Sequence, residues 1–205
     1  MKKLSLIILI SFFINACNSQ KKRALIGETK YQQELNSSYK DASESPLTKR
    51  DLKNFKGLDF FPVDSSYIVI ASLTPTIDAP VFEMKTTTDR RPLYKEYGVI
   101  NFTVNGKDSE LTVYQDQSLD RDKKYDDYLF LPFTDHTSGN ESYGGGRYMD
   151  IFISDISSNN KVLLNFNNTY NPYCAYNPKY SCPITPRKNH LDLEIKAGVK
   201  AFKKH

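Results

Sequence analysis

The amino-acid sequence predicts a mainly β protein: a single antiparallel sheet domain, built as a sandwich or a partly open barrel, with one or two short N-terminal helices. Three observations predict this fold class. The chain has 205 residues, which suits one domain of about 100–200 residues. Aromatic residues make up 13%, with 14 Tyr and no Trp, and aromatic side chains favour strands. Short β-branched or apolar runs recur after residue 57, and two of them flank an Asn-Gly turn signal.

Residues 1–16 are predicted to be a bacterial lipoprotein signal peptide. Two lysines precede an apolar run over residues 4–14, and this run is too short for a membrane-spanning helix of about 20 residues. Ala16 directly precedes Cys17, which predicts that Cys17 is lipidated and becomes the new N-terminus. The alternative is an ordinary cleaved secretory signal with an incidental cysteine.

The predicted location is the cell envelope, where the lipid on Cys17 would hold the protein to a membrane. Asn18 stands where an Asp would retain a lipoprotein at the inner membrane, so the periplasmic face of the outer membrane is favoured. Removing residues 1–16 takes away two lysines and lowers the formal net charge from +4 to +2. That charge is too small for an electrostatic footprint on nucleic acid, so we expect no nucleic-acid partner.

The polar residues 17–28 are predicted to be a lipidated tether, and residues 29–56 a short helical segment. Within this segment Tyr31, Leu35 and Tyr39 recur every four residues, which is the spacing of one apolar edge of a helix.

A second short helix is predicted over residues 47–55. Ser45 would be its N-cap, Pro46 would occupy the first helical position, and Gly57 would end it.

The remaining residues, 57–205, are predicted to form the β-rich domain. Asn105 and Gly106 separate two apolar runs, 98–104 and 110–114, and this pattern predicts a tight hairpin. Apolar and aromatic runs predict further strands over residues 67–71, 128–133, 148–153, 162–166 and 191–195.

Residues 133–148 do not resemble a connecting loop. They contain Asp135, Glu141 and Arg147 among four glycines. Glycine backbones can form an anion-binding concavity, beside which Arg147 could hold a carboxylate or phosphate. The structural alternative, which we favour slightly, is a buried ion pair between Arg147 and Asp135, Glu141 or Asp150 that ties the loop to the sheet.

Residues 165–189 form a second unusual segment, fixed by several prolines. Cys174 and Cys182 are the two cysteines that remain after lipidation, and in an oxidising compartment they are predicted to form a disulfide. One alternative is a metal site that adds His136 or His190, although the spacing matches no zinc signature. A redox-active dithiol is a further alternative.

A catalytic constellation is less evident. A hydrolase could use Asp135, Glu141 or His136, with Arg147 polarising the scissile group. Asp135 could also pair with Asp150 as two carboxylates suited to a glycosidase. No Gly-x-Ser-x-Gly elbow accompanies the serines near His136. The sequence predicts no cofactor and no metal centre.

Several spaced motifs resemble those of one family. They read, with x for any residue, Phe60-Phe61-Pro62-Val63-Asp64, Phe133-x-Asp135-x-Thr137-Ser138-Gly139-x-Glu141-x-Tyr143-Gly144-x-Gly146-Arg147-Tyr148, Phe166-Asn167, Tyr170-Asn171-Pro172-x-Cys174-Ala175 and Cys182-Pro183-x-x-Pro186-x-x-Asn189-x-Leu191. Over residues 46–200 the chain resembles domain of unknown function 1684, a widespread bacterial family of uncharacterised, often secreted or lipid-anchored proteins. The resemblance brings no established activity. It implies that the Gly-Arg-Tyr and Cys-Pro segments are a shared core, which we expect to pack together and line one concave face.

The chain departs from the family pattern at two positions. Asn165 stands where the family has Asp, and Tyr173 stands where it has a second proline. Asn165 lacks the charge and basicity of a catalytic carboxylate. It marks either lost catalysis or a hydrogen-bonding strut, and we favour the strut.

The function predicted from these residues is that of a ligand-binding or interaction module of the envelope. The ligand would be a small molecule or a polysaccharide, sugar-like or anionic, anchored by Arg147. The residues expected to contact it are Tyr143, Tyr148, Tyr170, Tyr173 and Tyr176, with Asn171 beside them. The alternatives are the hydrolase described above and a purely structural partner of another envelope protein.

Overall fold

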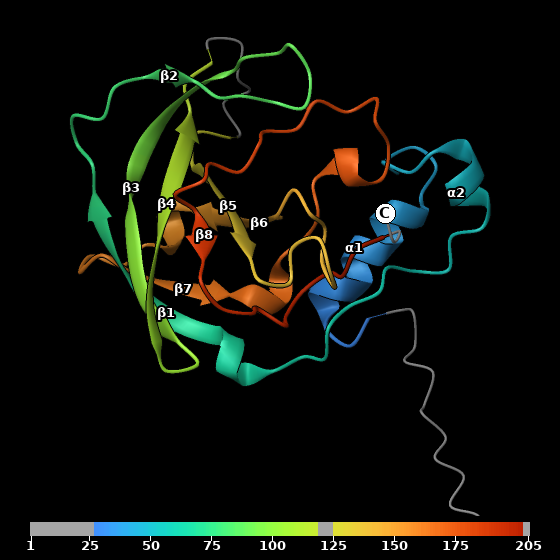
Figure 1. The fold of residues 1–205 in the computed structure, drawn as a ribbon, viewed down its shortest axis with the longest axis horizontal. Coiled ribbons are helices and arrows are strands. Elements are labelled where there is room, and N and C mark those ends of the chain that lie inside the picture. The colour runs from blue at the N-terminus through green and yellow to red at the C-terminus, as the bar shows by residue number, and fades with distance from the viewer. Residues whose placement is uncertain (1–26, 119–124, 203–205) are drawn as a thin grey trace, which may run out of the picture.

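The computed structural model describes residues 27–118 and 125–202. Two α-helices precede a sheet made of eight strands (Figure 1). The elements in chain order are α1 (Lys30–Lys40), α2 (Lys49–Lys53), β1 (Ile68–Pro75), β2 (Phe82–Glu83), β3 (Leu93–Val104), β4 (Lys107–Asp116), β5 (Tyr128–Asp135), β6 (Arg147–Phe152), β7 (Lys161–Asn165) and β8 (His190–Leu191). The predicted signal peptide and most of the predicted tether lie outside the described residues.

The sheet is a single curled layer, close to half a barrel. Its strand order is β6-β5-β4-β3-β1-β7, with β2 added beside β3 and β8 beside β5. Neighbouring strands along this path run antiparallel, and β8 is parallel to β5. In Figure 1, β1, β3 and β4 bend around one side of the molecule while β5 and β6 cross its middle. The predicted fold class is therefore confirmed.

The hairpin of β3 and β4 forms where the Asn-Gly signal predicts it. Asn105 has a φ of 49° and Gly106 a φ of 74°, so both central residues adopt the left-handed conformation that a two-residue hairpin turn requires. The register runs from Val104 opposite Lys107 to Tyr94 opposite Asp116, with one bulge near Gly98.

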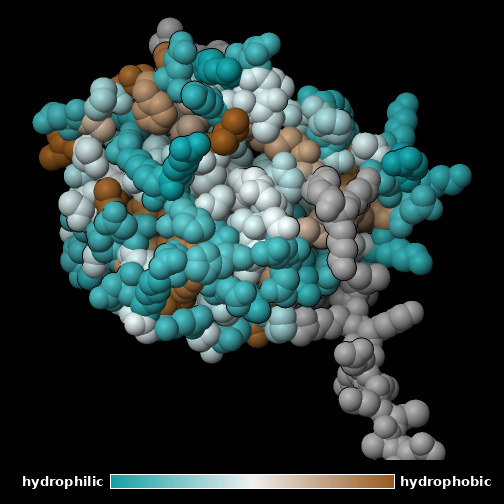
Figure 2. Space-filling model, viewed as in Figure 1, coloured by the Kyte–Doolittle hydropathy of each residue, from teal (hydrophilic) through white to brown (hydrophobic). Residues whose placement is uncertain are grey.

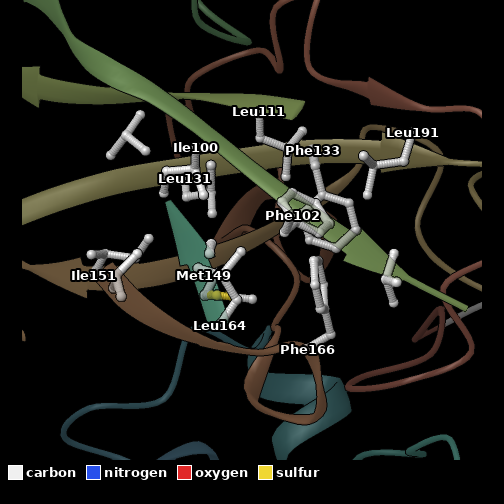
Figure 3. Packing of buried hydrophobic residues seen from close by; sticks show 14 of the residues in the cluster. Ile100, Phe102, Leu111, Leu131, Phe133, Met149, Ile151, Leu164, Phe166 and Leu191 are labelled. Carbon is white, nitrogen blue, oxygen red and sulfur yellow. The ribbon is translucent and has the colours of Figure 1, made fainter. Parts of the chain in front are cut away.

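The concave side of the curled sheet holds the main hydrophobic core. Three phenylalanine rings meet there, with Phe166 5.6 Å from Phe102 and 5.5 Å from Phe133 between ring centroids (Figure 3). On β6, Met149 and Ile151 point into this core. Tyr148 and Asp150 alternate with them along the strand and point to the other side of the sheet. The alternation of β6 thus separates two environments, and the candidate sites lie in them.

The N-terminal helices are present, but the second is shorter than predicted. The predicted N-cap Ser45 is wrong: α2 begins after Thr48, whose Oγ1 accepts a hydrogen bond from the backbone N–H of Asp51 at 3.2 Å. Thr48 also donates to the Asp51 carboxylate at 2.7 Å, a reciprocal cap that Ser45 lacks. Ser45 instead donates to the carbonyl of Tyr39 and thereby ties the loop before α2 to α1.

The strand predicted over residues 191–195 is also mostly wrong, since β8 ends at Leu191. Beyond Leu191, the backbone of Ile195 forms hydrogen bonds with side chains. The N–H of Ile195 donates to the carboxylate of Asp135 at 2.6 Å, and its carbonyl accepts from Arg147 at 2.8 Å. The side chains of Asp135 and Arg147 have replaced a neighbouring strand as the partners of Ile195.

The surface seen in Figure 2 is mainly hydrophilic, and its hydrophobic residues form small separate patches. Within the described ranges, the helices are all too short and too polar to cross a membrane.

Candidate functional site

Arg147 lies at the start of β6 and is wholly buried, with 0% of its surface exposed. Its Nη2 is 3.1 Å from Oδ2 of Asp135, which is 2% exposed, and its guanidinium also donates to the carbonyls of Ile195 and Ala197. The guanidinium carbon lies 5.6 Å from the ring centroid of Phe61, so the cation packs against an aromatic face.

The carboxylate of Asp135 has protein partners as well. It accepts hydrogen bonds from the hydroxyls of Thr137 at 2.9 Å and Ser138 at 3.1 Å, besides the N–H of Ile195. Arg147 and Asp135 therefore form a closed ion pair inside the protein. The structural alternative for Arg147 is the one the geometry supports, and the prediction that Arg147 anchors an anionic ligand is wrong because no ligand can reach it.

Glu141 and His136 do not join this ion pair. Glu141 is 3.3 Å from Lys196, and Nε2 of His136 is 3.0 Å from a carboxylate oxygen of Asp192. Both side chains are about half exposed. The residues of the predicted hydrolase thus do not assemble into a catalytic site in this structure.

The glycines before Arg147 serve the loop itself. Gly146 has a φ of +92°, and a Cβ there would lie 2.4 Å from the carbonyl oxygen of Phe133. Only glycine fits this close approach. The loop therefore turns tightly at Gly146 and delivers Arg147 to β6.

A different site lies on the opposite side of β5 and β6, between these strands, α1 and the segment 170–183. It is a cavity of about 490 Å³, a volume typical of small-molecule sites. More than half of the tyrosines of the chain are among its lining residues, which are Tyr31, Leu35, Tyr39, Tyr94, Tyr128, Phe130, Tyr148, Asp150, Tyr170, Pro172, Tyr173, Tyr180, Ser181, Cys182 and Pro183. We call this cavity the Asp150 pocket.

Asp150 is the one charged side chain among these lining residues. Its Oδ1 accepts hydrogen bonds from the hydroxyls of Tyr170 at 2.5 Å and Tyr128 at 2.9 Å. Within the described part of the chain, Oδ2 has no hydrogen bond and no Lys, Arg or His forms an ion pair with Asp150. The two tyrosines fix the carboxylate and leave one oxygen for a ligand.

The Asp150 side chain is exposed to solvent although rings of the pocket stand around it. Solvent reaches the side chain through the pocket, yet protein atoms surround it, and this desolvation raises the pKa of the carboxyl group above its usual value. The hydrogen bonds from Tyr170 and Tyr128 oppose that rise, because they favour the charged form. A carboxyl group perturbed in this way inside a cavity is typical of functional sites.

Helix α1 supplies one wall of the Asp150 pocket. Tyr31, Leu35 and Tyr39 form the apolar edge predicted from their spacing, and all three line the cavity. Thr29 caps the helix by accepting a hydrogen bond from the N–H of Gln32 at 3.2 Å. This cap stabilises the first turn of the helix, which contains Tyr31.

The tyrosines predicted to contact a ligand divide into two groups. Tyr148, Tyr170 and Tyr173 line the Asp150 pocket. Tyr176 does not, because it is 3% exposed and its ring packs edge-on against Tyr39 at 4.9 Å.

Asn171 and Tyr143 also lie outside the lining. Asn171 is fully buried and donates from Nδ2 to the carbonyl of Lys200 at 2.9 Å. Tyr143 lies beside Cys174 instead, where burial raises its pKa to about 12. Asn165 is the hydrogen-bonding strut that was favoured, since its Oδ1 accepts from both nitrogens of Asn167 at 3.1 Å.

The Gly-Arg-Tyr and Cys-Pro segments contact each other, as expected. Tyr148 and Tyr170 exchange backbone hydrogen bonds of 2.8 and 3.0 Å, and the hydroxyl of Tyr148 donates to the carbonyl of Pro183. Thr185 donates to the carbonyl of Gly145 at 3.0 Å. The concave surface that the two segments share is the Asp150 pocket, on the side of β5 and β6 that faces away from the main core. Tyr148 lines this pocket and Arg147 does not.

Asp150 was predicted from the sequence only as a partner of Arg147 or Asp135, and not as a ligand contact. Strand periodicity contains the missing signal. Asp150 is two residues from Tyr148 and pairs with Phe130, so these side chains share one face of the sheet.

The family model described as a protein of unknown function (DUF1684) matches residues 53–200. The chain belongs to the DUF1684 family. The solution NMR structure of an uncharacterised protein from Haloarcula marismortui is similar to this DUF1684 protein, with 31% sequence identity and a TM-score of 0.66 over 85% of this chain and 92% of that chain. A search of curated proteins found no match to this chain. Helix α1, with its part of the pocket wall, precedes the segment that the family model matches.

Cys174 and Cys182 of this DUF1684 protein lie together at the rim of the Asp150 pocket, and Cys182 is part of its lining. They are free thiols in this structure, and the N–H of Cys174 is 3.2 Å from Sγ of Cys182. A hydrogen bond from the Cys182 thiol lowers the pKa of Cys174 to about 7, and the same contact raises that of Cys182. His136 and His190 do not complete a metal site with them, since the described ranges contain no group of three His, Cys, Asp or Glu side chains suited to a metal ion.

Proposed function

We propose that this protein binds a small organic molecule in the Asp150 pocket and works at the cell envelope, where a lipid on Cys17 anchors it. One observation carries the proposal: a fixed carboxylate stands alone among tyrosine rings in a cavity of about 490 Å³. Apolar pockets with a few convergent polar groups are the usual form of ligand sites. Many rings give contact area at a low entropic cost, since a tyrosine has two side-chain dihedrals to fix.

The envelope location is supported by the sequence signals alone: a charged start, a short apolar run and the Ala16-Cys17 pair. Incorporation of labelled palmitate tests this part of the proposal. The label is expected to be lost in Cys17→Ser and retained in Cys174→Ser, and a label that persists in Cys17→Ser contradicts the anchor.

Ligand binding is tested by thermal-shift screening of the full chain against sugars, amino acids, amines and nucleosides. Binding to the folded state raises the melting temperature, by an amount that follows from the ratio of ligand concentration to Kd. At least one class is expected to stabilise the protein.

The same compounds are then tested on Tyr173→Ala, which removes a half-exposed ring of the lining, and on Ile184→Ala as a control. Ile184 is similarly exposed, at 49%, but lies outside the lining. The stabilisation is expected to shrink in Tyr173→Ala and to persist in Ile184→Ala. If no compound stabilises the protein, or if the two variants respond alike, the pocket is not the binding site.

A further inference from the structure

We infer that the ligand of the Asp150 pocket carries a protonated amine, which binds between the Asp150 carboxylate and the tyrosine rings around it. This inference rests on the proposed function, because it concerns the chemistry of the same pocket. It follows from the charges, the hydrogen-bond capacity and the rings of the lining.

The lining of the Asp150 pocket carries a negative charge without a cation beside it among the described residues. Asp150 carries the one carboxyl group of the lining, and the lining contains no Lys, Arg or His. The guanidinium of Arg90 lies beside the lining residue Ser181, but it is engaged there, since it donates to Oγ of Ser181 at 3.1 Å and to its carbonyl at 2.9 Å. A negatively charged ligand would meet an uncompensated carboxylate, whereas a cation would neutralise it.

The hydrogen-bond capacity of the carboxylate points the same way. Both tyrosine hydroxyls donate to Oδ1, from Tyr170 at 2.5 Å and from Tyr128 at 2.9 Å. Oδ2 keeps its acceptor capacity free among the described residues. An N–H group with a positive charge is its strongest complement, because hydrogen bonds between ionised partners are about twice as strong as neutral ones.

The aromatic rings next to Asp150 also favour a cation. Phe130 and Tyr148 stack edge-to-face at 4.7 Å, and Tyr148 and Tyr170 at 6.0 Å, so the rings hold one another in fixed orientations next to Asp150. The faces of aromatic rings carry negative charge density and attract ammonium groups. An amine with an apolar body would thus contact both features of the lining at once.

The decisive experiment compares two ligands that differ in this one group. Titration calorimetry of the full chain at neutral pH would use 2-phenylethylamine and its neutral analogue 2-phenylethanol. The amine is expected to bind at least about tenfold more tightly, since a charge-assisted bond replaces a neutral one. Its advantage is expected to decrease as salt is added.

Two variants assign the advantage to one carboxylate. Asp150→Asn keeps an acceptor for both tyrosine hydroxyls but removes the charge, and is expected to abolish the preference for the amine. Asp155→Asn makes the same change on an exposed residue outside the lining and is expected to preserve the preference.

The outcomes separate this inference from the proposed function. If the alcohol binds as tightly as the amine and Tyr173→Ala weakens both, the pocket is a ligand site but the amine inference is wrong. If the preference persists in Asp150→Asn, the inference is also wrong. If neither compound binds at millimolar concentration, the inference and the aromatic ligand site on which it rests both fail.

Discussion

Two carboxylates on neighbouring strands have opposite surroundings. Asp135 at the end of β5 is buried on the concave side of the sheet and is neutralised by Arg147 at 3.1 Å. Asp150 on β6 faces the other side, is open to solvent and has tyrosine hydroxyls in place of a cation. The comparison teaches that a satisfied charge holds a fold together, whereas a carboxylate left without a cation in a cavity is available to a ligand.

The largest expected effect comes from breaking the buried ion pair. Arg147→Ala leaves Asp135 charged and without a cation in the interior, which typically costs about 3–5 kcal/mol. For a domain of this size each kcal/mol lowers the melting temperature by about 2–4 °C, so calorimetry is expected to show a fall of roughly 6–20 °C.

Two further variants separate the ion pair from the general effect of losing an arginine. Arg187→Ala removes an exposed guanidinium and is expected to change stability by less than about 0.5 kcal/mol. The double variant Asp135→Leu with Arg147→Met is expected to recover part of the loss, because it removes both buried charges. An unchanged melting temperature in Arg147→Ala would show that Arg147 does not hold the loop.

Sequence periodicity predicted most of the fold, and Asp135 pairs with Arg147 as the favoured alternative proposed, but Asp150 was not predicted to contact a ligand. The Asn105-Gly106 turn and the spacing of Tyr31 and Tyr39 are local signals, and the structure confirms both. Arg147 and Tyr148 are adjacent in sequence and so were assigned to one site. Adjacent residues of a strand point to opposite faces, and this separates the buried arginine from the pocket tyrosine.

Other features depended on contacts that no local pattern records. The segment 191–195 alternates apolar and acidic residues and was predicted to be a strand, but the Asp135–Arg147 pair uses the backbone groups of Ile195. The short β2 strand, Phe82–Glu83, lacks a run long enough to be recognised. Tyr94 and Tyr180 belong to the pocket only because the sheet curls and the 170–183 segment folds across it.

The next largest effect is expected from a disulfide between Cys174 and Cys182 at the rim of the Asp150 pocket. With a pKa of about 7, the Cys174 thiol is substantially ionised at neutral pH, and the Cys182 sulfur lies beside it. Under oxidising conditions peptide mapping is expected to find the two residues linked. The bond is expected to add about 2–3 kcal/mol to the free energy of unfolding, mainly by restricting the unfolded chain.

Melting the protein with and without a reductant measures this contribution, and Cys174→Ser provides the control because its melting temperature should not respond to the reductant. Arg147→Ala should lose the same stability in both redox states, since its ion pair lies on the other side of the sheet. Recovery of two alkylated thiols from the oxidised wild-type protein would refute the disulfide.

The smallest expected effect is the pH dependence that Asp150 contributes to stability. Desolvation raises its pKa in the folded state, so the folded protein binds a proton more readily than the unfolded chain does. The stabilisation from this proton is complete below the unfolded pKa of about 3.9, and it is lost as the pH rises through the folded pKa. The facing groups Tyr31, Tyr128 and Tyr170 stay neutral across this range, because burial raises their pKa values.

Asp150→Asn removes this titration while keeping an acceptor for the two tyrosine hydroxyls. The variant is therefore expected to be slightly more stable than the wild type at neutral pH, by less than about 1 kcal/mol, and the difference should shrink as the pH falls towards 4. Urea denaturation of both proteins between pH 4 and 8 measures it, with Asp155→Asn as the matched control. The amine ligand should reverse the order at neutral pH by stabilising only the wild type. A wild type that is already the more stable protein at neutral pH without ligand would mean that Asp150, like Asp135, is a structural charge.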